Sequence, residues 1–204
     1  YDKFMVKLVM SIFSNIIQSK YEIYITKHAD VILKEAFSQE YNEIVELLEN
    51  FIIGKSSLIK KGGRKSEISK EVDKFLIESR EWEEKEFSTS ITSDGNTREN
   101  PTHKIDCYKN RVAFETEWNN KTEFYDRDLN NFRILNDLDN ISLGIILTRS
   151  STLNTVFKDL GIQDKYGSST THMDKLIKKI QGGGAGGCPI IAIGIKKECI
   201  DFDK

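Results

Sequence analysis

The sequence predicts a mixed α/β fold in which helices cover both faces of one β-sheet. Two continuous apolar runs, at 140–148 and 188–195, are typical of strands that are buried on both faces of a sheet. Segments with apolar residues at helical spacing alternate with these runs, which is the pattern of an α/β protein. The 204 residues are enough for a sizeable core and no proline-rich linker divides them, so we expect a single domain over residues 1–204.

The expected elements follow one another in a simple order. A strand with alternating apolar residues at 20–26 leads into a helix over 28–52, which Gly54 is placed to end. The later expected elements are a helix at 66–82, a strand at 83–92, a turn at 93–102, a β-hairpin at 104–118, helices at 122–138, 152–161 and 171–181, and the two apolar strands. The glycine run at 181–187 lacks the Lys-Ser/Thr of a phosphate-binding loop, so we interpret it as a flexible connection.

Composition and charge exclude few classes of protein. Apolar residues make up 38% of the chain and charged residues 30%, as in an ordinary soluble protein. The apolar segment 4–17 is interrupted by Lys7 and is shorter than the roughly 20 residues of a membrane-spanning helix, so we expect a helical extension over 1–19 and no membrane partner. The three cysteines lack C-x-x-C spacing, which predicts neither a disulfide framework nor a zinc site and fits a reducing cytoplasm.

One local stretch is strongly basic although the formal net charge of the chain is −2. Lys60, Lys61, Arg64 and Lys65 lie among glycines between residues 54 and 65, and this stretch contains no acid. Flexible basic side chains beside glycines can contact DNA phosphates, so these four residues are candidate DNA-binding residues. The alternative is an ordinary solvated loop.

The segment IDCYKNRVAFETEW, residues 105–118, is expected to form a β-hairpin that carries acids. If Lys109 and Asn110 form a two-residue turn, Asp106 pairs with Ala113 on the opposite strand. Because side chains alternate across a strand, Asp106 then shares one face with the two acids of the second strand. Cys107 points to the other face, where it is better interpreted as a core residue than as a ligand.

The three acids of this hairpin predict a metal site. Asp106 and Glu115 would be diagonal neighbours roughly 7–8 Å apart, with Glu117 on the same face. Such carboxylates repel one another unless a cation neutralises them, and oxygen ligands favour Mg²⁺ or Mn²⁺ over Zn²⁺. An ion held by Asp106 and Glu115 can activate water and stabilise a leaving oxygen at phosphorus. The alternative is an exposed acidic hairpin edge without such a role.

The acids also resemble a known catalytic motif. Asp106, followed nine positions later by Glu115-Thr116-Glu117, resembles the motif of the PD-(D/E)xK nuclease superfamily. Within it the chain is similar to type II restriction endonucleases of the BglII/BstYI/BamHI-like group, on residues 24–33, on the hairpin and on the two apolar strands. The resemblance implies a restriction-endonuclease-like mixed sheet and a Mg²⁺-dependent homodimer that cuts a short palindromic double-stranded DNA site, with a GATC core, in a prokaryotic cytoplasm.

The resemblance also implies roles for single residues. The metal-binding acids of the family fall on Asp106 and Glu115, and the third catalytic position falls on Glu117, where most of the superfamily has lysine. BamHI-like enzymes also have glutamate there, which implies that Glu117 either deprotonates the attacking water or helps to hold the metal. Ile105 departs from the family pattern, because a proline usually precedes the first acid.

The residues after the hairpin are expected to contact DNA. Asn119 and Asn120 carry amides that can read base edges, and Lys121 can hold a phosphate. The corresponding position in related enzymes touches the recognition sequence, whereas the alternative for Asn120 is a helix cap. By resemblance, the helix at 122–138 forms the dimer contact and the glycine run approaches DNA; the alternatives are a helix that only covers the sheet and a plain connection.

Three other functions remain open at this point. The same catalytic hairpin serves DNA repair and junction-cutting nucleases, so such an enzyme is the first alternative. A DNA-binding protein that does not cut is the second, although acids that face phosphate would weaken its binding. A structural protein with an incidental acidic hairpin is the third, and it predicts no affinity for DNA even when a divalent cation is present.

Overall fold

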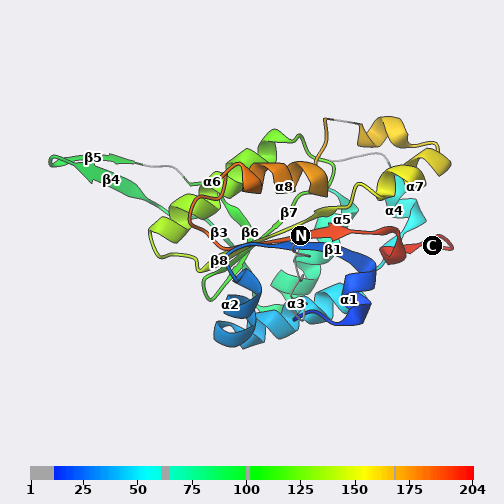
Figure 1. Ribbon diagram of the computed structural model, residues 1–204, viewed down its shortest axis with the longest axis horizontal. Helices are drawn as coiled ribbons and strands as arrows, with labels where there is room; N and C mark the ends of the chain where they lie inside the picture. The colour runs from blue at the N-terminus through cyan, green and yellow to red at the C-terminus, as the bar shows by residue number, and fades with distance from the viewer. Residues whose placement is uncertain (1–11, 61–64, 100–101, 168) are drawn as a thin grey trace, which may run out of the picture.

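The computed structural model describes residues 12–60, 65–99, 102–167 and 169–204, and its centre is a mixed six-stranded sheet (Figure 1). Its strands are β1 (Tyr21–Ile25), β3 (Glu83–Lys85), β6 (Ile105–Lys109), β7 (Val112–Thr116), β8 (Leu143–Arg149) and β9 (Ile190–Ile195). They lie in the order β1-β9-β8-β7-β6-β3. The central strands β7, β8 and β9 are parallel, whereas β1, β6 and β3 are antiparallel to their neighbours.

Helices cover both faces of this sheet. The helices are α1 (Asn15–Lys20), α2 (Ala29–Ala36), α3 (Ser38–Asn50), α4 (Lys55–Ile59), α5 (Glu67–Asp73), α6 (Glu123–Asp137), α7 (Leu153–Asp159) and α8 (Met173–Gln181). Apolar side chains of α1 to α5 and α7 form one cluster with the sheet, and those of α6 and α8 form a second cluster on the opposite face. In Figure 1, α6 and α8 lie above the sheet and α1 to α3 below it. The predicted fold class is therefore confirmed.

One predicted helix is divided, and another contains a π-helical turn. The helix expected over 28–52 is α2 followed by α3, because Phe37 leaves the helical conformation with φ −130° and ψ 53°. The break turns the chain so that Leu33 of α2 and Ile44 of α3 both reach the core. The helix expected over 66–82 is continuous from residue 67 to residue 80: α5 leads into a π-helical turn over Lys74–Glu78, and helix follows at 79–80. The break at Phe37 has no glycine or proline signal in the sequence.

The smaller elements lie at the edges of the molecule. The strand expected at 83–92 is in fact β3 and β4 (Ser90–Ser93), and β4 forms a projecting hairpin with β5 (Asn96–Glu99) (Figure 1). The two short strands β2 (Ile53–Gly54) and β10 (Ile200–Asp201) pair in parallel, and 3₁₀ turns occupy Gln163–Tyr166 and Lys197–Cys199. The glycine run packs against α6: a Cβ added at Gly186 would lie 2.7 Å from the side chain of Arg133.

The amino-terminal extension expected over 1–19 is described only in part. Residues 1–11 lie outside the described residues, and α1 begins at Asn15 with the Ser14 hydroxyl accepting a hydrogen bond from the backbone of Ile17. Within the described part of the chain, no helix is long and apolar enough to cross a membrane.

Candidate active site

The turn of the acidic hairpin lies one residue later than predicted. Lys109 pairs with Val112, so the two turn residues are Asn110 and Arg111 and not Lys109 and Asn110. Both turn residues have positive φ values, 44° and 71°. This is the conformation of a type I′ turn, whose twist matches that of the flanking strands.

Buried polar contacts explain this register. The Nζ of Lys109 donates to Oε1 of Glu43 at 2.7 Å, and the indole Nε1 of Trp82 donates to Oε2 of Glu43, also at 2.7 Å. The side-chain amide of Asn110 donates to Glu40 at 2.7 Å. The predicted turn would have removed Lys109 from the strand and from its partner on α3, a contact that sequence spacing does not reveal.

The corrected register brings the acids closer together than expected. Ala113 lies opposite Tyr108, so its predicted partner Asp106 is shifted two positions along β7 toward Glu115. A shift of two positions preserves the face on which each side chain lies. The backbone N–H of Asp106 donates to Oε2 of Glu115 at 3.4 Å, and that of Thr116 donates to Oδ2 of Asp106 at 3.2 Å.

Glu115 and Glu117 are buried at the carboxyl end of β7, with 1% and 2% of their surfaces exposed, whereas Asp106 is half-buried. Oε1 of Glu115 has no hydrogen-bond partner among the described residues. Oε2 of Glu117 accepts a hydrogen bond from the side-chain amide of Asn120 at 2.6 Å. Oε1 of Glu115 is therefore left unsatisfied in the interior, and Oδ2 of the nearby Asp128 is a second buried carboxylate oxygen without a partner among the described residues.

A fourth acid, Asp128 of α6, belongs to the same cluster. Its side chain is fully buried and accepts a hydrogen bond from Nε of Arg127 at 2.9 Å. The same guanidinium reaches Oε1 of Glu117 at 3.3 Å, so Arg127 bridges the two carboxylates. Sequence reasoning missed Asp128, although it interrupts the apolar face of α6 between Tyr125 and Leu129, which was the available signal.

The crowding of these carboxyls changes their acidity. Burial raises the pKa of Glu115 well above its usual value, and the charges of Asp128, Asp106 and Glu117 raise it further. Burial and Asp128 raise the pKa of Glu117 to about 9, although Asn120 and Arg127 act in the opposite direction. Burial also raises the pKa of Asp128 despite the adjacent Arg127. Burial and mutual repulsion therefore disfavour the charged forms of Glu115, Glu117 and Asp128.

A cavity of about 860 Å³ opens over this cluster. Its wall includes Asp106, Glu117 and Arg127, and its rim carries basic and aromatic side chains from α4, α5 and the turn after α7. The buried acids thus lie at the wall of a space that a substrate can enter.

The chain matches the family model of restriction endonuclease BglII/BglIII over residues 21–195. It belongs to that family. The match runs from β1 to β9 and includes the four acids and the cavity. As a restriction endonuclease of the BglII/BglIII family, the chain is a DNA-binding phosphodiester hydrolase, as the sequence resemblance predicted. No curated protein matches the chain.

Enzymes of the BglII/BglIII family typically depend on a metal. Among the described residues, no group of three or more His, Cys, Asp or Glu side chains is arranged as a metal centre. Asp106 and the unpartnered Oε1 of Glu115 nevertheless fit Mg²⁺, which is usually held by only one or two carboxylates together with water and substrate phosphate.

The structure brings most of the predicted DNA-binding residues to the cavity of this family member. Asn119, Asn120, Lys60 and Lys65 line it, whereas Lys121 is exposed beside it and forms a backbone bridge with Thr170. Lys61 and Arg64 lie outside the described residues.

Acids from a neighbouring helix lie beside the basic stretch, although the stretch itself contains none. Lys60 forms an ion pair with Glu67 at 3.2 Å, and Lys65 forms one with Asp73. Both acids belong to α5, which packs beside the stretch. An amphipathic helix that follows a basic loop can thus supply counter-charges that the loop itself lacks.

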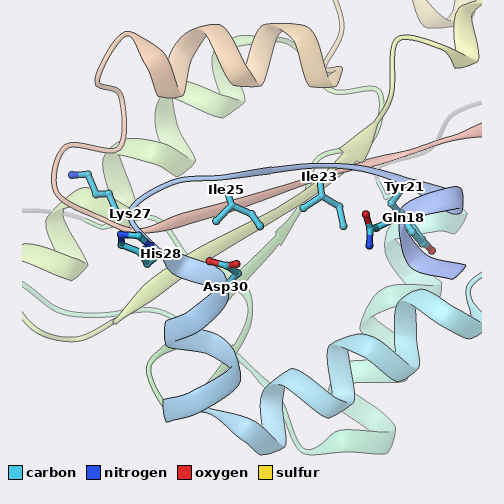
Figure 2. A pocket seen from close by; sticks show the side chains of 7 residues that line it. All are labelled: Gln18, Tyr21, Ile23, Ile25, Lys27, His28 and Asp30. Carbon is cyan, nitrogen blue, oxygen red and sulfur yellow. The ribbon is translucent and has the colours of Figure 1, made fainter. Parts of the chain in front are cut away.

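A second cavity, of about 540 Å³, lies beneath the edge strand β1 (Figure 2). Ile23 and Ile25 point from β1 into it, and Asp30 at the start of α2 supplies its one carboxylate. No pair of acids lines it, so of these two cavities among the described residues the larger one fits the chemistry of a restriction endonuclease.

Proposed function

We propose that this family member is a type II deoxyribonuclease that hydrolyses phosphodiester bonds within a short palindromic duplex site in the presence of Mg²⁺, for which Mn²⁺ can substitute. The observation that carries the proposal is the unpartnered, buried Oε1 of Glu115 beside Asp106, in a cluster that opens into a cavity. Asn119 and Asn120 line the same cavity, which supports recognition and cleavage of one bound DNA.

Asp106 and Glu115 would hold the metal. When bound, Mg²⁺ would position the scissile phosphate and stabilise the charge that develops on it. Asp106 is oriented for this role by the backbone N–H of Thr116, which occupies one of its oxygens at 3.2 Å. Glu115 is held by the backbone of Asp106 and keeps its other oxygen free.

Glu117 would act on the attacking water. Asn120 and Arg127 already contact its two oxygens, at 2.6 and 3.3 Å, so it is less available as a metal ligand than Glu115. A carboxylate held in this way can accept the proton of a water molecule as the water oxygen bonds to phosphorus and one phosphoester bond breaks. The alternative role, in which Glu117 ligates the metal, predicts loss of metal affinity on substitution.

The remaining contacts would position and read the DNA. Amides of Asn119 and Asn120 can pair with base edges, and Lys121 can hold a phosphate. The four basic residues Lys60, Lys61, Arg64 and Lys65 would hold the flanking phosphates, after exchange of ion pairs such as that between Lys60 and Glu67.

A palindromic site calls for two symmetric active sites, so we propose a homodimer with each subunit cutting one strand. The exposed side of α6 is the proposed contact, since its inner side is occupied by the sheet and α8. A GATC core is the proposed centre of the recognition sequence, by similarity to the BglII/BstYI/BamHI-like group.

The first experiment is cleavage of unmethylated phage DNA with and without Mg²⁺, beside Glu115→Gln and a control, Glu99→Gln, on the exposed strand β5. Discrete fragments that require Mg²⁺, persist in Glu99→Gln and vanish in Glu115→Gln are expected. Intact DNA with folded wild-type protein, or undiminished cleavage by Glu115→Gln, would contradict the proposal. Cleavage of branched DNA alone would favour a junction-cutting enzyme.

A further inference from the structure

Arg149 is a buried guanidinium at the carboxyl end of β8. Only 1% of the residue is exposed, and none of the ion pairs among the described residues includes it. Its Nε has no hydrogen-bond partner in the same set. Burying a charge without a counter-charge is costly, so a guanidinium here requires a reason beyond filling space.

The contacts of Arg149 connect it to residues at the wall of the cavity that opens over the acids. Its Nη1 donates to Oδ1 of Asn154 at 3.0 Å and its Nη2 to Oγ1 of Thr170 at 2.9 Å. Its guanidinium carbon lies 5.4 and 5.8 Å from the ring centres of Phe157 and Tyr166, which stack on each other at 3.9 Å. Tyr166 itself lines the cavity.

Thr170 belongs to a segment that supports the loop after the catalytic strand. The backbone of Thr170 bridges to Lys121, and the backbone N–H of Thr171 donates to the carbonyl of Asn120 at 2.9 Å. The hydroxyl of Thr171 in turn accepts from the N–H of Asn120 at 3.2 Å and donates to the carbonyl of Glu117 at 3.3 Å. The loop that carries Glu117 and Asn120 is therefore tied to the segment that Arg149 holds.

Aromatic contacts form a second connection to the same loop. Tyr166, over which the guanidinium lies, meets the ring of Trp118 edge to face with 6.1 Å between centres. Trp118 directly follows Glu117 and also lines the cavity. One planar cation thus contacts both supports of the loop, which a flexible ammonium or a neutral side chain cannot do at once.

We propose that Arg149 is a positioning residue that fixes residues 117–121 for catalysis and base reading through Thr170 and Tyr166. The inference rests on the proposed function of those residues as water-orienting and DNA-reading groups. Because Arg149 acts through other residues, its loss should lower turnover and sequence discrimination while general attraction to DNA phosphates persists.

The test compares Arg149→Met, Arg149→Lys and Thr170→Val with a control, Arg98→Met, on the exposed strand β5. Thr170 is only half-buried, so Thr170→Val should fold even if the Arg149 variants do not. For Arg149→Met we expect kcat to fall about 10- to 100-fold, the cost of a misplaced catalytic group, with little change in KM or in Ca²⁺-supported binding to unrelated DNA. Arg149→Lys should restore little, and Thr170→Val should show a smaller loss.

Amide hydrogen exchange supplies a readout that does not depend on cleavage. The backbone amides of Asn120 and Thr171 should lose protection in Arg149→Met and Thr170→Val while the melting temperature and the protection of β8 stay near those of Arg98→Met. Wild-type exchange and kcat in Thr170→Val and in any folded Arg149→Met would overturn the role of Arg149. If the wild-type protein fails to cut DNA but the exchange effect appears, the proposed function fails and the positioning role stands.

Discussion

The two ends of the acidic hairpin both lie against buried acids, but the surroundings shift the pKa values of these acids in opposite directions. At the turn, hydrogen bonds from Lys109, Gln39 and Trp82 outweigh the burial of Glu43 and hold its pKa below the usual value. At the carboxyl end of β7, burial and neighbouring acids raise the pKa of Glu115 and of Glu117. The first arrangement stabilises the hairpin. The second is unfavourable in the metal-free protein, and perturbed acids of this kind cluster at functional sites.

The largest expected effect is the loss of DNA cleavage when Glu115, at the carboxyl end of β7, is replaced. Glu115→Gln should lower the cleavage rate by at least about 10²-fold, the usual scale for removing one charge-stabilising group from an active site. Its melting temperature without metal should not fall, because the substitution removes repulsion with Asp106 and Asp128. Cleavage assays and thermal unfolding of the same preparation check both parts; a destabilised Glu115→Gln would mean that the two ends do not differ as described.

At the turn of the hairpin, Glu43→Gln should lower the free energy of unfolding. It leaves the buried Nζ of Lys109 without its carboxylate, and breaking such a pair costs about 3 kcal/mol. Urea unfolding measures the change. The matched control is Glu46→Gln, which removes an exposed ion pair with Arg80 and should cost less than about 1 kcal/mol. Equal losses in the two variants would remove the distinction between a buried and an exposed pair.

The acid cluster should also set a pH dependence. The folded-state pKa of Glu117 is about 9 against an ordinary value of 4.5, so between these values the folded metal-free protein binds more protons than the unfolded chain. The free energy of unfolding contributed by this group is therefore greatest at low pH and is lost as the pH rises toward 9. Glu117→Gln should flatten that decline in thermal unfolding without metal. A slope equal to that of the wild type would show that Glu117 is not the titrating group.

Metal binding should follow the opposite trend. Because carboxylate ligands must lose their protons, the affinity for Mn²⁺ should rise as the pH rises, and protons should be released on binding. Calorimetric titration in buffers of different ionisation enthalpy measures both quantities. Affinity that is independent of pH would argue against ligation by Glu115.

The smallest expected effects distinguish a base contact by Asn119 from a phosphate contact by Lys121. Asn119→Ala should reduce discrimination between the recognition site and single-base variants by about 1–3 kcal/mol, as for loss of a base contact. Lys121→Ala, at an exposed position beside the cavity, should weaken binding to all sequences alike and lower the salt slope by about 1. Cleavage of matched oligonucleotides at several salt concentrations separates the two, and a sequence-specific effect of Lys121→Ala would reverse their assignment.

Much of the fold could be predicted because local patterns carry it. Continuous apolar runs predict β8 and β9, and apolar residues at helical spacing predict α6. Each of these patterns lies within the element that it predicts. The break at Phe37 and the start of the turn at Asn110 could not be predicted in this way. Each depends on contacts with residues far along the chain, such as that between Asn110 and Glu40.

The sequence by itself determined that Glu115 and Glu117 share a face, because side-chain alternation along one strand holds whatever the register of the turn. Asp106 shares that face because the turn has two residues in the structure, as predicted. It also determined the family, through the spacing of Asp106 and Glu115. Only the tertiary structure decided which groups complete the site. Asp128 and Arg149 come from other elements, and packing buries their charges and brings them close to the residues that follow β7 and to the segment that supports them. The effect of a charged side chain depends on its burial and on its neighbours, and both are set by the fold.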